Sequence, residues 1–531
     1  MTAKNTTTPA PGPGAKYGQN PANGRDPTVR VILAVGLAAG VAVMLAWAWL
    51  PVRTLIEWIP DDSFYYFQPA SLMARGYIPS FDGVHAGNGF HPLWMLLLVP
   101  VCALKPLGAD LPVHLGLSLA GVMYVFTGYL IYRILRQMGV SGLFSAYGGA
   151  TFALWPSAVT TAVDGEVTPV NVLVLALLFL VYTRILLAAK ARRRDFVAWG
   201  LVAGLAVLAR NDNTIVLGLM GLFYLLLRRG ENKAASLALA AVAAVAAVLP
   251  WLAWNYSVAG EVWPTSTWAV PMLEHAQPRY AGLDLGGYLA TAWSKVVGYL
   301  TMLFFYSPLK AGVLVLYGVV AFAAIRGRRL AVATLGIFLA ALVALYVINA
   351  GVRWYVRTWH LGMAFLVNQL FLWYGLYAVF GKMKWARAFA HAAAALAVGF
   401  FVVDGVYTSR HVYFPWQSEM LNGGRWAAAH PHYRIGAFNC GLLAYYGAGN
   451  VVDLDGNMNV EGYRALRARR LYDYCRAEGV DYLVDYESWS LVRYRSFWPA
   501  DRVGRLEFYS DELDDPRHEF RDTPYYIYRL R

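Results

Sequence analysis

Uncharged apolar runs of membrane length recur along the first 408 residues, and they constrain the fold more than any other feature. The run from Val31 to Leu50 holds twenty residues without a charged side chain. A helix of about 20 apolar residues spans the hydrocarbon core of a bilayer. Because 58% of all residues are hydrophobic and only 15% are charged, we predict an α-helical polytopic membrane protein.

The positions of the charged residues indicate how these runs are oriented. The formal net charge of +13 could by itself suggest a nucleic-acid partner. The basic residues instead cluster in alternate connections between apolar runs, at 133–136, 190–194, 228–233, 326–329 and 382–387. Cytoplasmic loops of membrane proteins carry an excess of Lys and Arg. We therefore assign these connections to the cytoplasm and expect no nucleic-acid partner.

This assignment predicts about eleven crossings of the membrane. Residues 92–105 and 286–306 are also apolar, but crossings there would place basic clusters outside, so both are interpreted as interfacial or re-entrant helices. Residues 1–29 are expected to form a disordered cytoplasmic tail, and the odd number of crossings places residues 409–531 on the extracytoplasmic side. The predicted crossings are 30–51, 112–136, 142–162, 168–189, 196–210, 213–228, 234–255, 308–325, 330–349, 359–380 and 387–408.

Residues 409–531 have a mixed polar and aromatic composition that predicts a small extracytoplasmic α/β domain. The predicted strands are 434–438, 451–454, 482–485 and 525–529, and the predicted helices are 440–446, 461–468 and 470–478. The segments "VVDLDGNMN" and "GAFNCG" are interpreted as turns, because they lack EF-hand spacing and a GxGxxG pattern. Cys440 and Cys475 could form a disulfide here, but two buried free thiols are the favoured alternative.

The segment from Glu57 to Trp94 follows the first crossing and holds the strongest chemical signal. It begins with two adjacent carboxylates, Asp61 and Asp62, which repel each other, so one of them is expected to be held by a partner or poised as a base. Ser63 to Arg75 is predicted to form a short helix with aromatic side chains suited to a membrane interface. The alternative role of the two aspartates is to cap this helix.

The order of acidic pair, aromatic helix, "SFDG" and "NGFHPLW" in this segment resembles the first external loop of the GT-C glycosyltransferases. These membrane enzymes take a sugar from a polyprenyl-phosphate carrier, and they include the protein O-mannosyltransferases and the lipid A aminoarabinose transferases. The resemblance implies a GT-C transmembrane domain over residues 30–408, of about eleven helices, with a catalytic external loop at 52–111. It does not identify the sugar.

The resemblance also implies roles for individual residues. The family's catalytic base falls on Asp61. Asp62 stands where the family often has Glu, and because of this difference the resemblance does not decide whether a divalent metal is required. A functional Asp in the outer loop before the fourth crossing falls on Asp164. In the aminoarabinose transferases a Lys before Pro meets the donor phosphate, and His91 before Pro92 occupies that position here, so its charge would depend on pH.

Other polar residues near the predicted outer surface are candidates for substrate contacts. Arg210 and Asp212 form a polar tip between two short apolar runs, where internal ion pairing is the alternative to a functional site. Arg353 and Arg357 in "VRWYVRTWH" suit bidentate phosphate binding, although an interfacial belt is equally consistent. His91, Arg210, Arg353 and Arg357 are thus the expected contacts of the donor phosphate and lipid. The remaining expected substrate contacts are Tyr65, Asn88, Glu166, Asp212, Trp354 and His360.

These inferences predict a membrane-embedded glycosyltransferase of the cytoplasmic (inner) membrane. It would transfer a hexosyl or pentosyl group from a polyprenyl-phosphate sugar to an extracytoplasmic glycan, lipid or protein, with inversion and an Asp general base. No bound cofactor is expected apart from the open question of a metal. The alternative is a transporter or flippase of a lipid-linked sugar, which would also bury Arg and Asp in a helical bundle.

Overall fold

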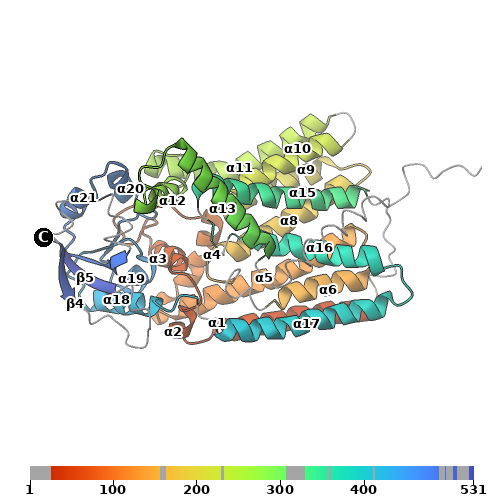
Figure 1. The fold of residues 1–531 in the computed structure, drawn as a ribbon, viewed down its shortest axis with the longest axis horizontal. Helices are drawn as coiled ribbons and strands as arrows, with labels where there is room; N and C mark the ends of the chain where they lie inside the picture. Colours follow the sequence, from red (N-terminus) through yellow and green to blue (C-terminus); the bar gives the residue numbers. More distant parts are fainter. Residues whose placement is uncertain are drawn as a thin grey trace, which may run out of the picture.

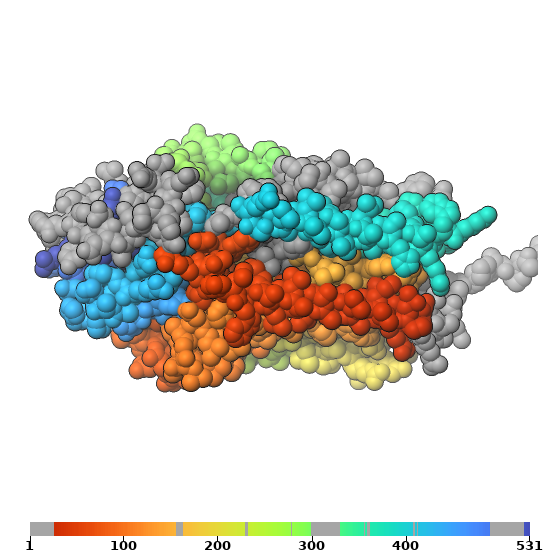
Figure 2. Space-filling view, turned by 90° about the horizontal axis from the view of Figure 1, so that it is seen from below, coloured from red at the N-terminus to blue at the C-terminus, as the bar shows by residue number. Residues whose placement is uncertain are grey.

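The computed structural model describes residues 26–155, 163–228, 232–305, 329–354, 356–357, 360, 362–410, 413–488, 497, 506–510 and 525–530. Long helices lie side by side along the longest axis of the molecule, and a sheet with short helices lies beyond one end of them (Figure 1). Figure 2 shows this division on another face, where red α1 runs along the bundle and the blue C-terminal segments lie past its end. The predicted fold class, a helical membrane protein with a small sheet, is confirmed.

Seven described helical segments are long and apolar enough to cross a membrane. Five of them are whole helices: α1 (Pro27–Ala48), α5 (Leu111–Gln137), α8 (Thr168–Leu187), α11 (Lys233–Ala259) and α16 (Gly362–Phe380). The sixth, Leu330–Arg353, consists of most of α15 (Arg329–Ile348) and the π-helical turn η5 (Asn349–Arg353). The seventh is most of α17 (Ala386–Arg410). The shorter helices α6 (Gly142–Ala153), α9 (Arg193–Ala209) and α10 (Asn213–Leu227) complete the described bundle. The predicted crossing at 308–325 lies outside the described residues, so the number of crossings remains a prediction.

The two apolar segments that were not expected to cross have distinct geometries. Helix α4 (Pro92–Cys102) has 11 residues, too few to span a bilayer. Helix α13 (Leu285–Phe305) runs obliquely to the long helices in Figure 1 and is not one of the seven candidate spans. Both features agree with an interfacial or re-entrant placement.

The sheet has the order β2-β1-β3-β5-β4. Strands β1 (Ile435–Ala437), β2 (Val451–Asp453) and β3 (Tyr482–Tyr486) run parallel to one another, whereas β4 (Leu506–Ser510) and β5 (Tyr525–Leu530) extend it with antiparallel pairing. The four predicted strands and three predicted helices are present, the helices as α19 (Gly441–Tyr446), α20 (Val460–Arg467) and α21 (Leu471–Ala477). Strand β4 and helix α18 (Gln417–Ala429) were not predicted.

The two faces of this sheet belong to different hydrophobic clusters. Tyr482 and Val484 of β3 belong to the same cluster as the core of the helical bundle, while Leu483 points to a second cluster with α20 and α21. This alternation is the period-two pattern of a strand buried on both faces. Cys440 and Cys475 lie in the first and second cluster respectively, and both are buried free thiols, as the favoured alternative predicted.

The segment after α1 joins the bundle to the C-terminal region through backbone contacts. After α2 (Val52–Leu55), the Glu57 carbonyl oxygen accepts hydrogen bonds from the backbone N–H groups of Tyr413 and Phe414, at 3.1 and 2.9 Å. Farther along, the N–H of Val460 donates to the carbonyl of Ala86 at 3.0 Å. The first external loop is therefore packed directly against residues that follow it by more than 300 positions.

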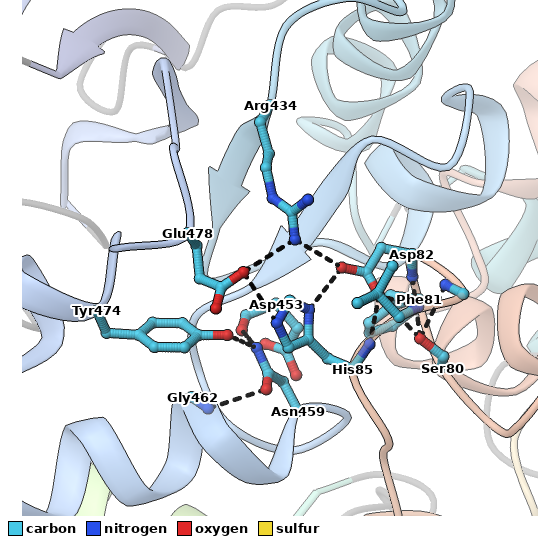
Figure 3. Close-up of polar contacts among 12 residues, drawn as sticks. Ser80, Phe81, Asp82, His85, Arg434, Asp453, Asn459, Gly462, Tyr474 and Glu478 are labelled. Carbon is cyan, nitrogen blue, oxygen red and sulfur yellow. Dashed lines mark hydrogen bonds and ion pairs between the residues drawn. The ribbon is translucent and has the colours of Figure 1, made fainter. Parts of the chain in front are cut away.

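A charged cluster fixes the same loop at a second point (Figure 3). His85 Nδ1 lies 2.7 Å from Asp82 Oδ2, and its Nε2 lies 3.0 Å from Glu478 Oε2. Arg434 Nη2 approaches the same two carboxylates, at 3.5 and 3.1 Å, and the ring of Tyr474 packs edge-on against His85. Because carboxylates only accept hydrogen bonds, both imidazole nitrogens must donate, which requires the protonated ring.

This cluster predicts a pH-dependent contribution to stability. The hydrogen bond to Asp82 raises the pKa of His85 despite the opposing effect of burial. The stabilisation is therefore complete below the unfolded pKa of about 6.5 and is lost as the pH rises through the raised folded value. We expect His85→Gln to lower the free energy of unfolding by about 1.5–3 kcal/mol at pH 6 and by much less at pH 9. Thermal unfolding in detergent at both pH values measures this difference.

His114→Gln is the matched control, because His114 Nδ1 donates to the carbonyl of Ala48 at 2.8 Å rather than to a carboxylate. Its replacement removes a hydrogen bond to an uncharged carbonyl, so it should not reproduce the loss of an ion pair expected for His85→Gln at pH 6. An equal loss for His85→Gln at pH 6 and pH 9 would contradict the charged cluster.

Candidate active site

A cavity of about 420 Å³ lies where the bundle meets the C-terminal region. Its size is in the range of small-molecule sites. It is bounded by the 3-10 turn η2 (Asp61–Ser63), the start of α4, the connection between α9 and α10, α12 (Ser266–His275) and residues after η5. The C-terminal region closes the remaining side. The polar and aromatic lining residues are Asp61, Asp62, Tyr65, Tyr66, His91, Glu166, Arg210, Asn211, Asp212, Ser266, Thr267, Arg353, Arg357, His360, Tyr413, Phe414, Trp416, Gln417, Asn439, Asp455, Asn457 and Tyr486.

Asp61 is held by the backbone of the C-terminal region. Its Oδ2 accepts a hydrogen bond from the N–H of Gly441 at 3.1 Å, and its Oδ1 accepts from the N–H of Leu442 at 2.6 Å. A Cβ at position 441 would lie 2.3 Å from the Asp61 carbonyl oxygen, so this approach requires glycine. Ser63, the N-cap residue of helix α3 (Phe64–Met73), makes no side-chain cap hydrogen bond, and the Asp61 carboxylate is turned toward the C-terminal region instead.

Burial sets the proton affinity of Asp61. Its side chain is 8% exposed, and burial raises the pKa of its carboxyl group to about 7. The N–H of Leu442 opposes this rise, and the neighbouring Asp62 adds to it. A carboxylate with a pKa near 7 that faces a cavity suits general-base catalysis at neutral pH.

Two further carboxylates face the cavity beside Asp61. Asp62 and Glu166 both line it, and burial followed by repulsion from Asp62 raises the pKa of Glu166 well above its usual range. Asp164 is fully buried and does not line the cavity. Its Oδ1 accepts from the N–H of Glu166 at 3.1 Å, its backbone carbonyl accepts from Ser63 Oγ at 2.5 Å, and its Oδ2 has no hydrogen-bond partner among the described residues. Of the two acids in this loop, it is Glu166 that faces the cavity.

Cationic groups gather at a different part of the lining. Arg210 is held in a bidentate pair with Asp212, with Nε to Oδ1 at 3.0 Å and Nη2 to Oδ2 at 2.9 Å. Asn349 Nδ2 also donates to Asp212 Oδ2 at 3.3 Å. The guanidinium of Arg353 has no hydrogen bond or ion pair in the part of the chain that the structure describes. Asp212 attracts Arg353 as well as Arg210, but its carboxylate oxygens are hydrogen-bonded to Arg210, so the guanidinium of Arg353 can still donate to an anion.

The two histidines of this group act as neutral polar side chains. Burial, with repulsion from Arg210, lowers the pKa of His91 to about 3, and its Nδ1 is buried without a partner among the described residues. His91 can therefore hydrogen-bond a phosphate, and its lowered pKa favours the neutral ring at neutral pH; its role as a pH-dependent cation stays a prediction. His360 Nδ1 accepts a hydrogen bond from the N–H of Arg357 at 3.0 Å.

Two of the expected substrate contacts lie outside the lining. Asn88 Oδ1 accepts from the N–H and Oγ1 of Thr265, at 3.1 and 2.9 Å, so it ties the first external loop to the start of α12. Trp354 is packed among His275, Tyr280 and Tyr288, with ring centroids 4.4 to 4.9 Å apart. Asn88 and Trp354 therefore support the walls of the cavity and do not face its interior.

The C-terminal wall was not anticipated. Asn439, Asp455 and Asn457 come from the two segments that were interpreted as turns, and Tyr486 ends β3. Tyr65 OH lies 3.0 Å from Asp455 Oδ2 and connects this wall to α3. The signal in the sequence was a polar turn directly after a buried strand, which the search for calcium and dinucleotide motifs did not detect.

The lining therefore has an acidic end and a basic end. The acidic end consists of Asp61, Asp62 and Glu166, and the basic end consists of Arg210, Arg353 and Arg357 with His91, Asp212 and His360. Glu166 interacts electrostatically with both Asp62 and Arg210, so the two ends are adjacent. Among the described residues, no three His, Cys, Asp or Glu side chains are placed to hold a metal ion.

Comparison with known proteins places the chain among particular folds. The family model of dolichyl-phosphate-mannose-protein mannosyltransferases matches residues 115–254, and a model of a domain of unknown function matches residues 411–528. No curated protein matches the sequence.

One similar solved structure is the oligosaccharyltransferase AglB of Archaeoglobus fulgidus in complex with an inhibitory peptide and a dolichol-phosphate. The TM-score is 0.58 at 12% sequence identity, and the match covers 94% of this chain and 74% of the AglB chain. ArnT of Cupriavidus metallidurans bound to undecaprenyl phosphate is similar with a TM-score of 0.56 at 13% identity, over 93% of this chain and 98% of its own.

Proposed function

Because the chain has the fold of the GT-C glycosyltransferases, we propose that it transfers a sugar from a polyprenyl-phosphate carrier to an acceptor hydroxyl. The GT-C domain would comprise residues 30–408, with the α/β domain at 409–531. The cavity and this domain would lie on the extracytoplasmic side of the cytoplasmic membrane. The dolichol-phosphate and undecaprenyl phosphate bound to the two similar proteins support a lipid phosphate as the carrier.

The observation that carries this proposal is the juxtaposition of an acidic and a basic end in one cavity. Sugar transfer needs a base that removes the acceptor proton and a cationic site that receives the negative phosphate as it departs. Asp61 meets the first need and Arg353 the second. The bidentate Arg210–Asp212 pair holds a second guanidinium at the same place.

The reaction then follows from these positions. The acceptor oxygen attacks the anomeric carbon and loses its proton to the Asp61 carboxylate. The bond from the anomeric carbon to the phosphate oxygen breaks, and its electron pair leaves with the phosphate, which Arg353, Arg357 and Arg210 stabilise. A single displacement of this kind inverts the anomeric configuration.

Supporting roles follow for the residues around this centre. Asp62 and Glu166 would orient hydroxyl groups of the transferred sugar. Asp164 would position Glu166, because its carboxylate accepts a hydrogen bond from the backbone N–H of Glu166. His91 and His360 would donate hydrogen bonds to the phosphate. Tyr65 and Asn88 hold the first external loop against its neighbours, and Trp354 fixes the segment that carries Arg353.

The test is turnover by the purified full-length protein in detergent. We expect it to release polyprenyl phosphate from one member of a panel of polyprenyl-phosphate hexoses and pentoses when acceptors are supplied. Assays with EDTA and with added Mg²⁺ or Mn²⁺ measure any dependence on a metal. A protein that moves the lipid-linked sugar across vesicles without forming product would instead be a transporter or flippase.

A further inference from the structure

Polar residues follow the carboxyl ends of all three parallel strands and reach the cavity there. Asn439 comes two residues after β1, Asp455 and Asn457 follow β2, and Tyr486 is the last residue of β3. In α/β sheets the carboxyl ends of parallel strands are the usual location of ligand sites. The edge of the C-terminal sheet at which the parallel strands end, where α/β domains usually bind ligands, therefore faces the cavity.

The polar groups of this wall are held in place by hydrogen bonds, those of Asn439 to Asp485 included, and one of them, the amide oxygen of Asn457, has no partner among the described residues. Asp455 is 6% exposed, and its Oδ1 and Oδ2 accept from the N–H and Nδ2 of Asn457, at 2.7 and 2.8 Å. Asn457 Oδ1 is buried without a hydrogen-bond partner among the described residues. A buried amide oxygen without a partner is costly unless a ligand donates to it.

The charge of the wall distinguishes it from the basic end. None of the cavity-lining residues described between 413 and 488 is Lys, Arg or His. Asp455 is hydrogen-bonded to Asp453, and burial together with repulsion from Asp453 raises the pKa of Asp455 well above its usual range. Burial and the neighbouring carboxylate thus favour the protonated form of Asp455, and the wall offers hydrogen-bond donors and acceptors without a basic side chain.

Aromatic side chains adjoin these polar groups. Tyr413, Phe414 and Trp416 line the cavity on the segment that leads into α18, and the rings of Phe414 and Trp416 meet edge-on with centroids 5.9 Å apart. Flat aromatic surface beside a few fixed polar groups suits a ligand that has both apolar faces and hydroxyl groups. A sugar ring has both.

The wall is also rigidly placed relative to Asp61. A Cβ at Gly89 would lie 1.9 Å from the carbonyl oxygen of Asn457, so the backbones of the first external loop and the β2–α20 connection are in direct contact. The same region that carries Asn439 donates the Gly441 and Leu442 hydrogen bonds to Asp61. An acceptor bound at this wall is therefore held next to the base.

We propose that Asn439, Asp455, Asn457 and the aromatic segment 413–416 form the acceptor subsite, and that the acceptor is a neutral sugar unit of a glycan. This inference rests on the proposed function, since it assigns the second substrate of the same cavity. A neutral polyhydroxylated ring matches the fixed hydrogen-bond donors and acceptors and the aromatic surface. A phosphate-bearing acceptor would find no cation on this wall.

The experiment measures binding without turnover. Full-length protein in detergent is titrated separately with neutral methyl disaccharides of hexoses and pentoses, with a Ser/Thr-containing peptide, and with undecaprenyl phosphate. We expect at least one disaccharide to bind and the peptide not to compete with it. Asn457→Ala and, independently, Asn439→Ala should weaken disaccharide binding by about tenfold while leaving undecaprenyl phosphate binding unchanged.

Arg353→Ala should give the opposite result, with weaker undecaprenyl phosphate binding and unchanged disaccharide binding. Retained lipid-phosphate binding also shows that the two asparagine variants are folded. Competition by the peptide, or disaccharide binding that both asparagine variants leave unchanged, would overturn the acceptor assignment alone. Failure of undecaprenyl phosphate to bind the parental protein would instead overturn the proposed function.

Discussion

Asp61→Asn should lower turnover of a polyprenyl-phosphate sugar by about 10²–10⁴-fold, the usual contribution of a general base. Asparagine keeps the shape of the side chain but cannot take the acceptor proton. The carboxylate accepts one hydrogen bond on each oxygen, from the N–H groups of Gly441 and Leu442. Asparagine has only one oxygen that can accept, so a moderate loss of stability is also expected. Turnover is measured at saturating donor, together with the thermal unfolding midpoint.

The matched control is Asp485→Asn. Asp485 is also a buried carboxylate held by backbone N–H groups, in this case those of Phe438, Asn439 and Tyr486 at 2.8, 3.2 and 2.8 Å, but it does not line the cavity. We expect a stability loss at least as large as that of Asp61→Asn. Because Asp485 also holds Asn439 of the acceptor subsite, turnover should fall by no more than the roughly tenfold loss expected for Asn439→Ala, well short of the loss expected for Asp61→Asn. Parental turnover by folded Asp61→Asn protein would end the catalytic assignment, and a loss confined to Asp62→Asn would move the role to its neighbour.

The pH dependence of turnover tests the same assignment. The pKa of Asp61 is raised to about 7, so the fraction of ionised base, and with it turnover, should fall as the pH drops below that value. The effect on stability has a defined sign. Because the folded pKa lies above the unfolded value of about 3.9, folding takes up a proton, and Asp61 lowers stability as the pH rises between those two values. Asp61→Asn should remove both dependences.

Arg353→Ala should lower kcat/KM for the donor by about tenfold to a hundredfold. A hydrogen bond between charged partners contributes about 1.5–3 kcal/mol, and Arg353 has no ion-pair partner in the described chain that would be left unpaired by its removal. Arg210→Ala would be harder to interpret, because it would leave the buried carboxylate of Asp212 without its ion-pair partner. Arg353→Lys should retain part of the activity, because lysine keeps the positive charge but cannot form the bidentate hydrogen bonds of the planar guanidinium.

Arg279→Ala serves as the control for this change. Arg279 is an exposed arginine that pairs with Glu274 at 3.3 Å outside the lining of the cavity. Its removal should leave kcat/KM for the donor within about twofold. If Arg353→Ala protein used donor as well as the parental protein does, the phosphate would have to bind elsewhere.

Local patterns in the sequence were sufficient for much of the fold. Runs of membrane length predicted the helical bundle, and alternation with turn residues predicted β1, β2, β3 and β5. The aspartate pair at 61–62 was recognised because the motif around it is continuous in sequence. Each of these predictions depends on residues within a few tens of positions of one another.

The site could only partly be predicted, because its remaining features depend on long-range packing. The hydrogen bond between Tyr65 and Asp455 joins residues 390 positions apart, and no periodicity indicates such a pairing. Asp164 and Glu166 are two residues apart in one loop, and only the fold decides that Glu166 faces the cavity. The neutral state of His91 follows from burial beside Arg210, which the dipeptide before Pro92 does not reveal.

The contact between Asp61 and the Gly441–Leu442 backbone also bears on how the protein is made. The N–H groups that hold the Asp61 carboxylate are translated some 380 residues after Asp61 itself. A nascent chain inserted in the membrane thus carries the acid without the groups that orient it. The base reaches its final geometry only when the C-terminal segment has folded back onto the first loop, so an incomplete chain would not yet be competent to consume the lipid-linked sugar.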